Sequence, residues 1–293
     1  DYFFDNSTKF DLKNTCMKKS VVPVLIISFI NFFNGASYSQ DSDWIWAKSA
    51  GGAGYDLGRE VAVDAYGNVY ATGHFTSDTI TFGTFTLTNI DSTDVFLAKY
   101  DENGTVLWAK SAGGTGNDSP WSLTVDSYGN AYVSGIFTSS TIIFGIDTLM
   151  NKGGRDVFLA KYDANGDVLW AKGAGGFSSD EAWSVAVDPS GNAYITGFFE
   201  SDTIQFGSYT LVNAGFLPNQ GHEDIFLAKY DANGNVLWAN SAGGLSSDEA
   251  WSVAVDASGN AYTTGYFASD TITFGSFNLM DDGNGDVFLT KYN

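Results

Sequence analysis

The sequence predicts an all-β protein, a β-propeller whose blades are four-stranded antiparallel sheets. Two observations support this fold class: one phrase recurs four times, and each repeat consists of short apolar runs separated by turn signals. The phrase Trp-Ala-Lys/Asn-Ser/Gly-Ala-Gly-Gly begins at intervals of 62, 62 and 68 residues, at Trp46, Trp108, Trp170 and Trp238. Tandem units of this kind bury their apolar surface against their neighbours, so the repeat indicates one stacked body.

The third repeat shows the elements in order. Four runs rich in Val, Ile, Phe, Tyr and Trp have the length of strands and lack a helical period; they are residues 183–188, 193–199, 224–230 and 235–241. Residues 189–192 form a turn between the first and second runs, and residues 231–234 form a turn between the third and fourth. Both turns have glycine where a positive φ is expected. Residues 203–211 predict a small extra hairpin between the second and third strands. Four such strands make one blade.

The phase of the repeat suggests how the row of blades could close. Residues 44–49 match a fourth strand, and residues 286–293 match a third strand. The N-terminal strand could therefore complete the last sheet and hide its edge. We expect either a four-bladed ring closed in this way or part of a larger ring, within a propeller domain that covers residues 41–293.

The N-terminal region predicts a secretory signal peptide at residues 17–40. Met17 precedes two lysines, an apolar run covers residues 21–33, and small residues follow. This run is shorter than the roughly 20 residues that cross a bilayer. Residues 1–16 are then an unstructured upstream extension. They contain Cys16, the chain's one cysteine, so we expect a secreted or cell-surface protein, with the periplasm as a second address, and no disulfides.

The repeat resembles a known family. Its pattern W-A-K-S-A-G-G, V-A-V-D-x-x-G-N-A-Y, T-I-x-F-G and D-V-F-L-A-K-Y-D-x-N-G over residues 44–293 is similar to the β-propeller repeat called SBBP, common in secreted proteins of Bacteroidetes-like bacteria. The resemblance implies a secreted or surface-exposed propeller and supplies no catalytic residues. The family's name implies seven blades, whereas four repeats are visible here.

Composition narrows the partners. Acidic residues outnumber basic ones by 34 to 14, giving a net charge of −20. This charge argues against nucleic acid and anionic membranes and favours cations or neutral surfaces. We expect a monomer without membrane insertion, with a glycan or protein as ligand.

The candidate ligand site lies where the chain crosses from one blade to the next. Loops on a rigid scaffold are where binding usually resides, so we expect the ligand on the face that carries these crossings. Trp121, Trp183 and Trp251 precede the ends of the first strands, with Arg59 in the same position of repeat one. Exposed indoles there offer flat faces for sugar rings; the alternative is that they pack between blades. The candidate ligand set also includes Glu181 and Glu249.

A carboxylate also recurs in these crossings. Asp56, Asp118, Asp180 and Asp248 each lie eight residues before the aspartate that ends the first strand. A ring of carboxylates with neighbouring carbonyls could hold calcium, which prefers six to eight oxygen ligands. The competing interpretation is that each aspartate accepts hydrogen bonds from backbone amides within its own turn.

The sequence favours a non-catalytic binding or scaffold module. The predicted mature chain lacks a cysteine nucleophile, and its two histidines, His74 and His222, stand outside the recurring motifs. Two alternatives stay open. The neighbouring carboxylates of Asp180, Glu181, Asp248 and Glu249 could serve a glycoside hydrolase-like enzyme acting on polysaccharides. The repeats could also form a spacer that binds nothing.

Overall fold

The computed structural model describes residues 43–215 and 222–293, of which Trp44–Asn293 form one compact unit. These described residues contain strands and turns and no helix, so none of them forms a helix able to cross a membrane. The predicted upstream extension and signal peptide lie outside the described residues.

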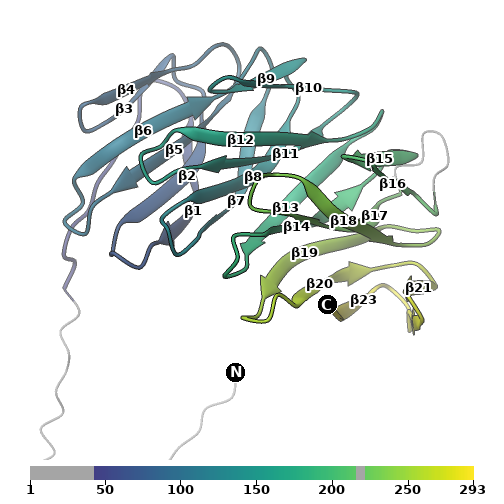
Figure 1. Ribbon diagram of the computed structural model, residues 1–293. Coiled ribbons are helices and arrows are strands. Elements are labelled where there is room, and N and C mark those ends of the chain that lie inside the picture. The colour runs from purple at the N-terminus through teal and green to yellow at the C-terminus, as the bar shows by residue number, and fades with distance from the viewer. Residues whose placement is uncertain (1–42, 216–221) are drawn as a thin grey trace, which may run out of the picture. The chain divides into compact units, whose positions relative to one another are not determined.

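Four sheets follow one another along the chain, each built on the same plan (Figure 1). The first strands of the sheets are β1 (Asp56–Val63), β7 (Asp118–Val125), β13 (Asp180–Val187) and β19 (Asp248–Val255). The second strands are β2 (Val69–Phe75), β8 (Ala131–Phe137), β14 (Ala193–Phe199) and β20 (Ala261–Phe267). The third strands are β5 (Asp94–Tyr100), β11 (Asp156–Tyr162), β17 (Asp224–Tyr230) and β23 (Asp286–Tyr292). The fourth strands are β6 (Val106–Ala112), β12 (Val168–Ala174) and β18 (Val236–Ala242).

A two-stranded hairpin lies between the second and third strands of every repeat, as the sequence predicts for the third. The hairpins are β3 (Thr79–Phe82) with β4 (Phe85–Thr88), β9 (Thr141–Phe144) with β10 (Asp147–Met150), β15 (Thr203–Phe206) with β16 (Tyr209–Val212), and β21 (Thr271–Phe274) with β22 (Phe277–Met280). Their alternate apolar side chains, Ile142 and Phe144 for example, are buried in the core of their own blade. The hairpins therefore extend each blade's core outward.

The strand order confirms the predicted β-propeller blade. The first three sheets run first, second, third, fourth strand, all antiparallel, and the last described sheet is β19-β20-β23. The predicted Asp-x-x-Gly turns are present: Gly67 donates its amide to Asp64 O at 3.1 Å and has a φ of 82°. A left-handed φ suits glycine because it has no Cβ.

The first strand of the third blade differs most from the prediction, while the fourth is shifted by one residue, to Val236–Ala242. The first strand of the third blade begins at Asp180, three residues before the predicted start at Trp183, and Asp180 pairs with Phe199. The acidic pair Asp180 and Glu181 suggested a loop. The structure keeps Asp180 in the strand because Ser201 donates its hydroxyl to the carboxylate at 2.8 Å, which satisfies the buried charge.

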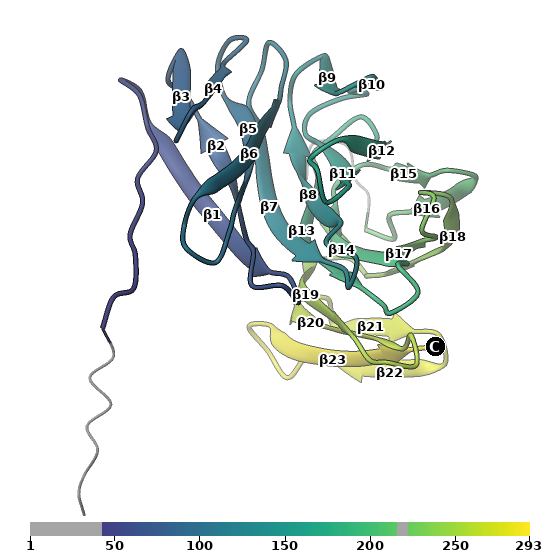
Figure 2. The same cartoon turned by 60° about the vertical axis from the view of Figure 1, so that its left-hand side comes forward.

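The blades stack through their first strands, with β1 beside β7, β7 beside β13 and β13 beside β19. Figure 2 shows the sheets fanning out along this row, with β1 at one end and β23 at the other. No comparable packing joins β19 back to β1 among the described strands. Residues 44–49 form no ladder with β23 in the described part of the chain, so the unit is an open row of blades.

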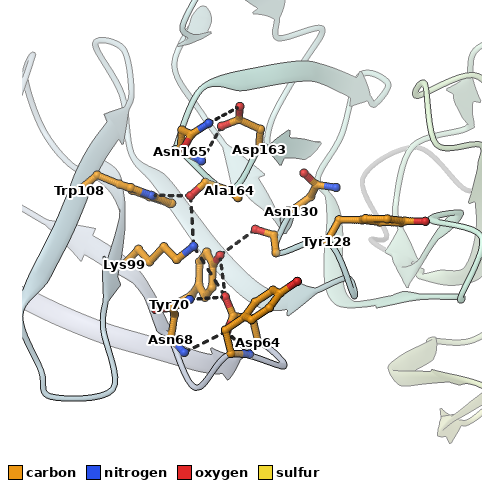
Figure 3. Close-up of polar contacts among 12 residues, drawn as sticks. Asp64, Asn68, Tyr70, Lys99, Trp108, Tyr128, Asn130, Asp163, Ala164 and Asn165 are labelled. Carbon is orange, nitrogen blue, oxygen red and sulfur yellow. Dashed lines mark hydrogen bonds and ion pairs between the residues drawn. The ribbon is translucent and has the colours of Figure 1, made fainter.

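The first two junctions between blades use the same polar contacts. At the first junction, Tyr70 donates its hydroxyl to Gly129 O at 2.7 Å, and both Trp108 Nε1 and Lys99 Nζ donate to Ala164 O at 3.1 Å (Figure 3). The recurring strand tryptophans therefore pack blades together, as the sequence predicts for them. The apolar clusters likewise contain residues from neighbouring blades.

Candidate functional site

The four first strands share an irregularity at one position. Their pairing with the second strands shifts register around a single bulged residue, which is Arg59 in β1, Trp121 in β7, Trp183 in β13 and Trp251 in β19. A bulge leaves its extra residue out of the ladder and redirects its side chain. Four of the predicted ligand residues are therefore displaced from regular pairing, whereas the other two, Glu181 and Glu249, stay paired in their strands.

These side chains meet across the blade junctions and form one continuous row. The Arg59 guanidinium carbon lies 4.2 Å from the centre of the Trp121 ring. Ring centres are 6.5 Å apart between Trp121 and Trp183 and 6.3 Å apart between Trp183 and Trp251. We call Arg59, Trp121, Trp183 and Trp251 the tryptophan row. It combines both sequence interpretations, because the rings contact one another across blades and also keep exposed surface.

The two ends of the row are more exposed than its middle. Trp121 and Trp183 are half-buried, whereas Arg59 is exposed and Trp251 is 53% exposed. Trp183 is held edge-on by Phe198 from the second strand, with ring centres 5.2 Å apart. A rigid series of accessible indole faces is suited to binding a flat, partly apolar ligand.

Two glutamates orient the indoles of Trp183 and Trp251. Glu181 Oε2 accepts from Trp183 Nε1 at 2.8 Å, and Glu249 Oε2 accepts from Trp251 Nε1 at 2.8 Å. The other oxygen of Glu181 pairs with the guanidinium of Arg155. The structure thus places both predicted glutamates at the tryptophan row and adds Arg155, which the sequence did not single out.

The opposite end of the row has different chemistry. Ser119 stands where the later blades have glutamate, and its hydroxyl shares a 2.7 Å hydrogen bond with His74 Nδ1. Burial lowers the pKa of His74, and the nearby Arg59 charge lowers it further while Asp56 opposes the shift. His74 is therefore neutral at neutral pH. Trp121 Nε1 is buried without a hydrogen-bond partner among the described residues.

The four aspartates predicted to bind a metal are each hydrogen-bonded to a serine of their own blade. Their carboxylates accept a hydroxyl hydrogen bond at 2.6 to 2.8 Å from Ser77, Ser139, Ser201 or Ser269. Gly52 N also donates to Asp56, and Gly176 N donates to Asp180, both at 2.7 Å. The described residues hold no group of three or more acidic, histidine or cysteine side chains arranged for a metal ion. Calcium binding stays a prediction, which melting curves with calcium and with chelator would decide.

The environments of these aspartates differ between the first blade, at the end of the row of blades, and the third blade, inside it. Burial raises the pKa of Asp180 to about 7 despite its hydrogen bonds. At Asp56, burial also acts to raise the pKa, but hydrogen bonds from Ser77, Gly52 and Thr76 outweigh it and lower the pKa. The same residue in the same fold position therefore has opposite shifts.

A second set of buried aspartates lies at the starts of the third strands. Asp94, Asp156 and Asp224 begin the third strands, are buried, and each has an Oδ1 without a hydrogen-bond partner in the described residues. Burial raises the pKa of Asp94 and Asp156 to about 6 and that of Asp224 to about 7. Their recurrence was visible in the Asp-Val/Ile-Phe-Leu motif, but its apolar residues suggested a packing role alone.

Two curated proteins are similar to this chain. An uncharacterized WD repeat-containing protein of Acanthamoeba polyphaga mimivirus, L264, is 27% identical over 321 aligned residues, which cover 87% of this chain and 23% of that protein. The regulatory protein FlaEY of Caulobacter vibrioides is 34% identical over 145 residues, covering 48% of this chain and 14% of that protein. The chain thus spans less than a quarter of either relative. No family model matches it.

The first of these similarities agrees with the observed sheets. WD repeats form four-stranded blades of β-propellers, and the described strands form such blades in tandem. The chain is a β-propeller repeat protein. A fold of this kind is compatible with a binding or scaffold role and does not itself identify a ligand.

Proposed function

We propose that this protein is a secreted, non-catalytic propeller module of the SBBP type, which binds a glycan along the tryptophan row. The observation that carries the proposal is the displacement of Arg59, Trp121, Trp183 and Trp251 from regular pairing into one partly exposed series. Strand bulges re-aim side chains and are frequent next to functional sites.

The row offers the two kinds of contact that sugar recognition needs. Indole faces pack on the apolar faces of sugar rings, and polar groups at the ring edges bind hydroxyls. Trp251, at one exposed end of the row, and the adjacent Glu249 supply an indole and a carboxylate side by side. Arg59 adds donors at the other end. A neutral glycan also suits a chain with a net charge of −20.

The carboxylates support binding better than hydrolysis. Paired-carboxylate hydrolysis needs one acid and one base or nucleophile facing the same bond. Asp180 and Glu181 are consecutive strand residues, whose side chains point to opposite faces. Asp180 is bonded to Ser201, and Glu181 is bonded to Arg155 and Trp183. These contacts hold both groups in structural roles.

A protein ligand is the second candidate, favoured by the similarity to a WD repeat-containing protein. Aromatic side chains and arginine are also enriched where proteins bind one another. Secretion and display at the cell surface rest on the predicted signal peptide at residues 17–40 and on the SBBP resemblance.

A glycan array with the intact protein tests the proposal. The triple variant Trp121→Ala, Trp183→Ala, Trp251→Ala should lose at least roughly tenfold in apparent affinity, since each aromatic contact contributes about 0.5–1.5 kcal/mol. The matched control replaces three exposed aromatics away from the row, Tyr66, Tyr128 and Phe277, and should bind like the parent. Circular dichroism checks that both variants keep their strand content.

Other outcomes would redirect the assignment. Equal glycan binding by parent and triple variant would remove the tryptophan row as the site. Release of reducing sugar from a polysaccharide, abolished by Glu181→Gln, would favour the enzyme alternative. Absence of any glycan signal together with capture of a protein through the row would favour the second candidate, and absence of both would leave a spacer.

A further inference from the structure

A cavity lies between the second and third blades, at the edge of the sheets opposite the first strands that carry the tryptophan row. Its volume is about 390 Å³, and beside it β15 of the third blade packs against β12 of the second (Figure 2). Its lining includes Lys172 and Gly173 of β12, Ser208 in the hairpin turn, and Asn235 and Val236 at the start of the fourth strand. A cavity of this size is large enough for a small organic molecule.

The preceding junction brings the same elements together but bridges them with an ion pair. Lys110 of β6 has the place that Lys172 has in β12, and its Nζ lies 3.5 Å from Asp167 Oδ1 in the turn of the second blade. Asn235 stands in the place of Asp167 in the third blade. Lys172 therefore has no carboxylate at this position, and it forms no ion pair within residues 43–215 and 222–293.

Two other differences from the second blade change the cavity. Gly173 stands in the place of Ser111, which removes a side chain from the fourth strand. A Cβ on Gly173 would lie 3.6 Å from its nearest atom, Leu149 Cβ, so packing does not require a glycine here. Ser208 stands in the place of Ile146, so a hydroxyl replaces an apolar side chain in the hairpin turn. Three differences at one junction thus leave a lysine without its acid and make its surroundings smaller and more polar.

The turn that faces Lys172 holds its side chain in place. A Cβ on Gly234 would lie 2.9 Å from Lys172 Cε, so the lysine stem packs on this glycine. Asp231, the acid of the same turn, accepts from Asn233 N at 2.9 Å and from both Asn235 N and Asn235 Nδ2 at 2.8 Å. The hydrogen bonds from Asn235 and Asn233 lower the pKa of Asp231. They also fix the Asn235 amide at the wall of the cavity.

The residues of the lining favour an anion with a single charge. Lys172 supplies the one positive charge, and Ser208 and Asn235 supply neutral polar groups. A hydrogen bond from an ammonium group to a carboxylate is roughly twice as strong as one between neutral groups. Multiply charged anions are disfavoured, because the chain has a net charge of −20. Val236 adds apolar surface beside the polar groups, the combination that ligand pockets ordinarily have.

We propose that this cavity binds a carboxylate-bearing molecule of the size of one sugar ring, such as a uronate. Lys172 holds the carboxylate, and Ser208 and Asn235 bind hydroxyl groups. The site is separate from the tryptophan row and does not depend on what that row binds. Its origin is the loss of an ion pair that the preceding junction retains.

The first blade has a related cavity that provides an internal comparison. Its volume is about 340 Å³, and its lining includes Lys48, Ser49 and Thr105. Ser49 keeps the side chain that Gly173 lacks, and Thr105 offers a hydroxyl where the third blade has the Asn235 amide. We therefore expect weaker carboxylate binding in the first blade than in the third.

Calorimetric titration of the intact protein with glucuronate tests the proposal. Lys172→Met should weaken binding at least roughly tenfold, because it removes the positive charge and keeps a long side chain. Lys110→Met is the matched control, since Lys110 has the same place in the repeat and is paired with Asp167; it should bind like the parent. Glucose, which has the ring without the carboxylate, should bind at least roughly tenfold more weakly than glucuronate.

Several results would overturn the assignment. The parent could fail to bind glucuronate, or it could bind glucose or inorganic phosphate as tightly, which would remove the carboxylate as the recognised group. Equal glucuronate binding by the parent and Lys172→Met, or loss of binding in Lys48→Met alone, would place the ligand elsewhere.

Exchanging residues between the two junctions provides the second test. Asn235→Asp with Gly173→Ser gives the third blade the residues of the second and should weaken glucuronate binding at least roughly tenfold, since the new carboxylate competes for Lys172. The reciprocal variant, Asp167→Asn with Ser111→Gly and Ile146→Ser, should add a second site and raise the stoichiometry by one. Thermal melts check that both variants stay folded. Unchanged binding by the first variant, or an unchanged stoichiometry in the second, would contradict the role given to these residues.

Discussion

The junctions inside the row and the two faces at its ends contain the same residue types in different environments. Leu159 and Leu289 occupy one position of the repeat, yet the first is fully buried and the second is mostly exposed. The same contrast separates Leu123 from Val61. The repeat motif specifies what each blade can bury, and the neighbouring blade decides whether it does.

This comparison explains why some residues of the recurring motif stabilise their own blade and others stabilise the contact with the next blade. The tyrosine, lysine and tryptophan of the first and second blades donate to carbonyls of the next blade's turns, as Figure 3 shows for the first blade. They are therefore contacts between units, and a blade in isolation would leave them unused. Stability in such a row is the sum of unit and junction contributions, so substitutions inside a junction should cost more than the same substitutions at an end.

The largest difference should come from truncating the equivalent leucines. Leu159→Ala removes a fully buried side chain and should lower the free energy of unfolding by about 2–5 kcal/mol. Leu289→Ala removes an exposed side chain and should change it by less than about 0.5 kcal/mol. Chemical denaturation of both variants beside the parent protein measures both changes in the free energy of unfolding.

A smaller difference is expected for two equivalent glycines. A Cβ on Gly113, which follows β6, would lie 1.9 Å from Asp94 Oδ1 at the start of the adjacent β5, whereas a Cβ on Gly51 would lie 3.5 Å from its nearest atom, Asp56 Oδ2. Gly113→Ala should therefore cost about 1–3 kcal/mol through overpacking. Gly51→Ala should change the free energy of unfolding by less than about 0.5 kcal/mol. Thermal melts of the two variants beside the parent check this; a similar loss in both would contradict the open front of the first blade.

Much of the architecture could be predicted because it follows from local residue patterns. The apolar runs identify the strands, and the Asp-x-x-Gly signals identify the turns, as Gly67 confirms with its φ of 82°. The extra hairpin follows from the short run at residues 203–211. Each of these features depends on neighbouring residues in the chain.

Features that depend on two blades could not be derived in the same way. The bulges at Trp121, Trp183 and Trp251 leave no mark in the alternation of residues, so the sequence could not decide between packing and exposure. Arg155, in the loop before β11, and His74 of β2 contact Glu181 and Ser119 beside the tryptophan row. Asp94 looked like the polar start of an apolar strand, and only the next crossing, which brings Gly113 against it, makes it a buried acid.

The smallest expected difference concerns the aspartates that begin the first strands. The pKa of Asp180 is raised to about 7, from an ordinary 3.8, so the folded protein holds this proton more tightly than the unfolded chain. Its contribution to stability is full below pH 3.8 and is lost as the pH rises to about 7. The pKa of Asp56 is lowered. Its contribution is present above pH 3.8 and is lost as the pH falls through the lowered value.

Replacing each by asparagine should therefore change the pH profile in opposite directions. Asp180→Asn should flatten the decline of the melting temperature between pH 4 and pH 7, apart from a constant offset from altered hydrogen bonds. Asp56→Asn should lower the melting temperature by a few degrees at pH 7 and progressively less below pH 4. Calorimetry from pH 3 to pH 8 gives both profiles. Parallel profiles for the two variants would show that burial by the preceding blade does not set these pKa values. The difference between interior and end blades would then apply to apolar side chains but not to charged ones.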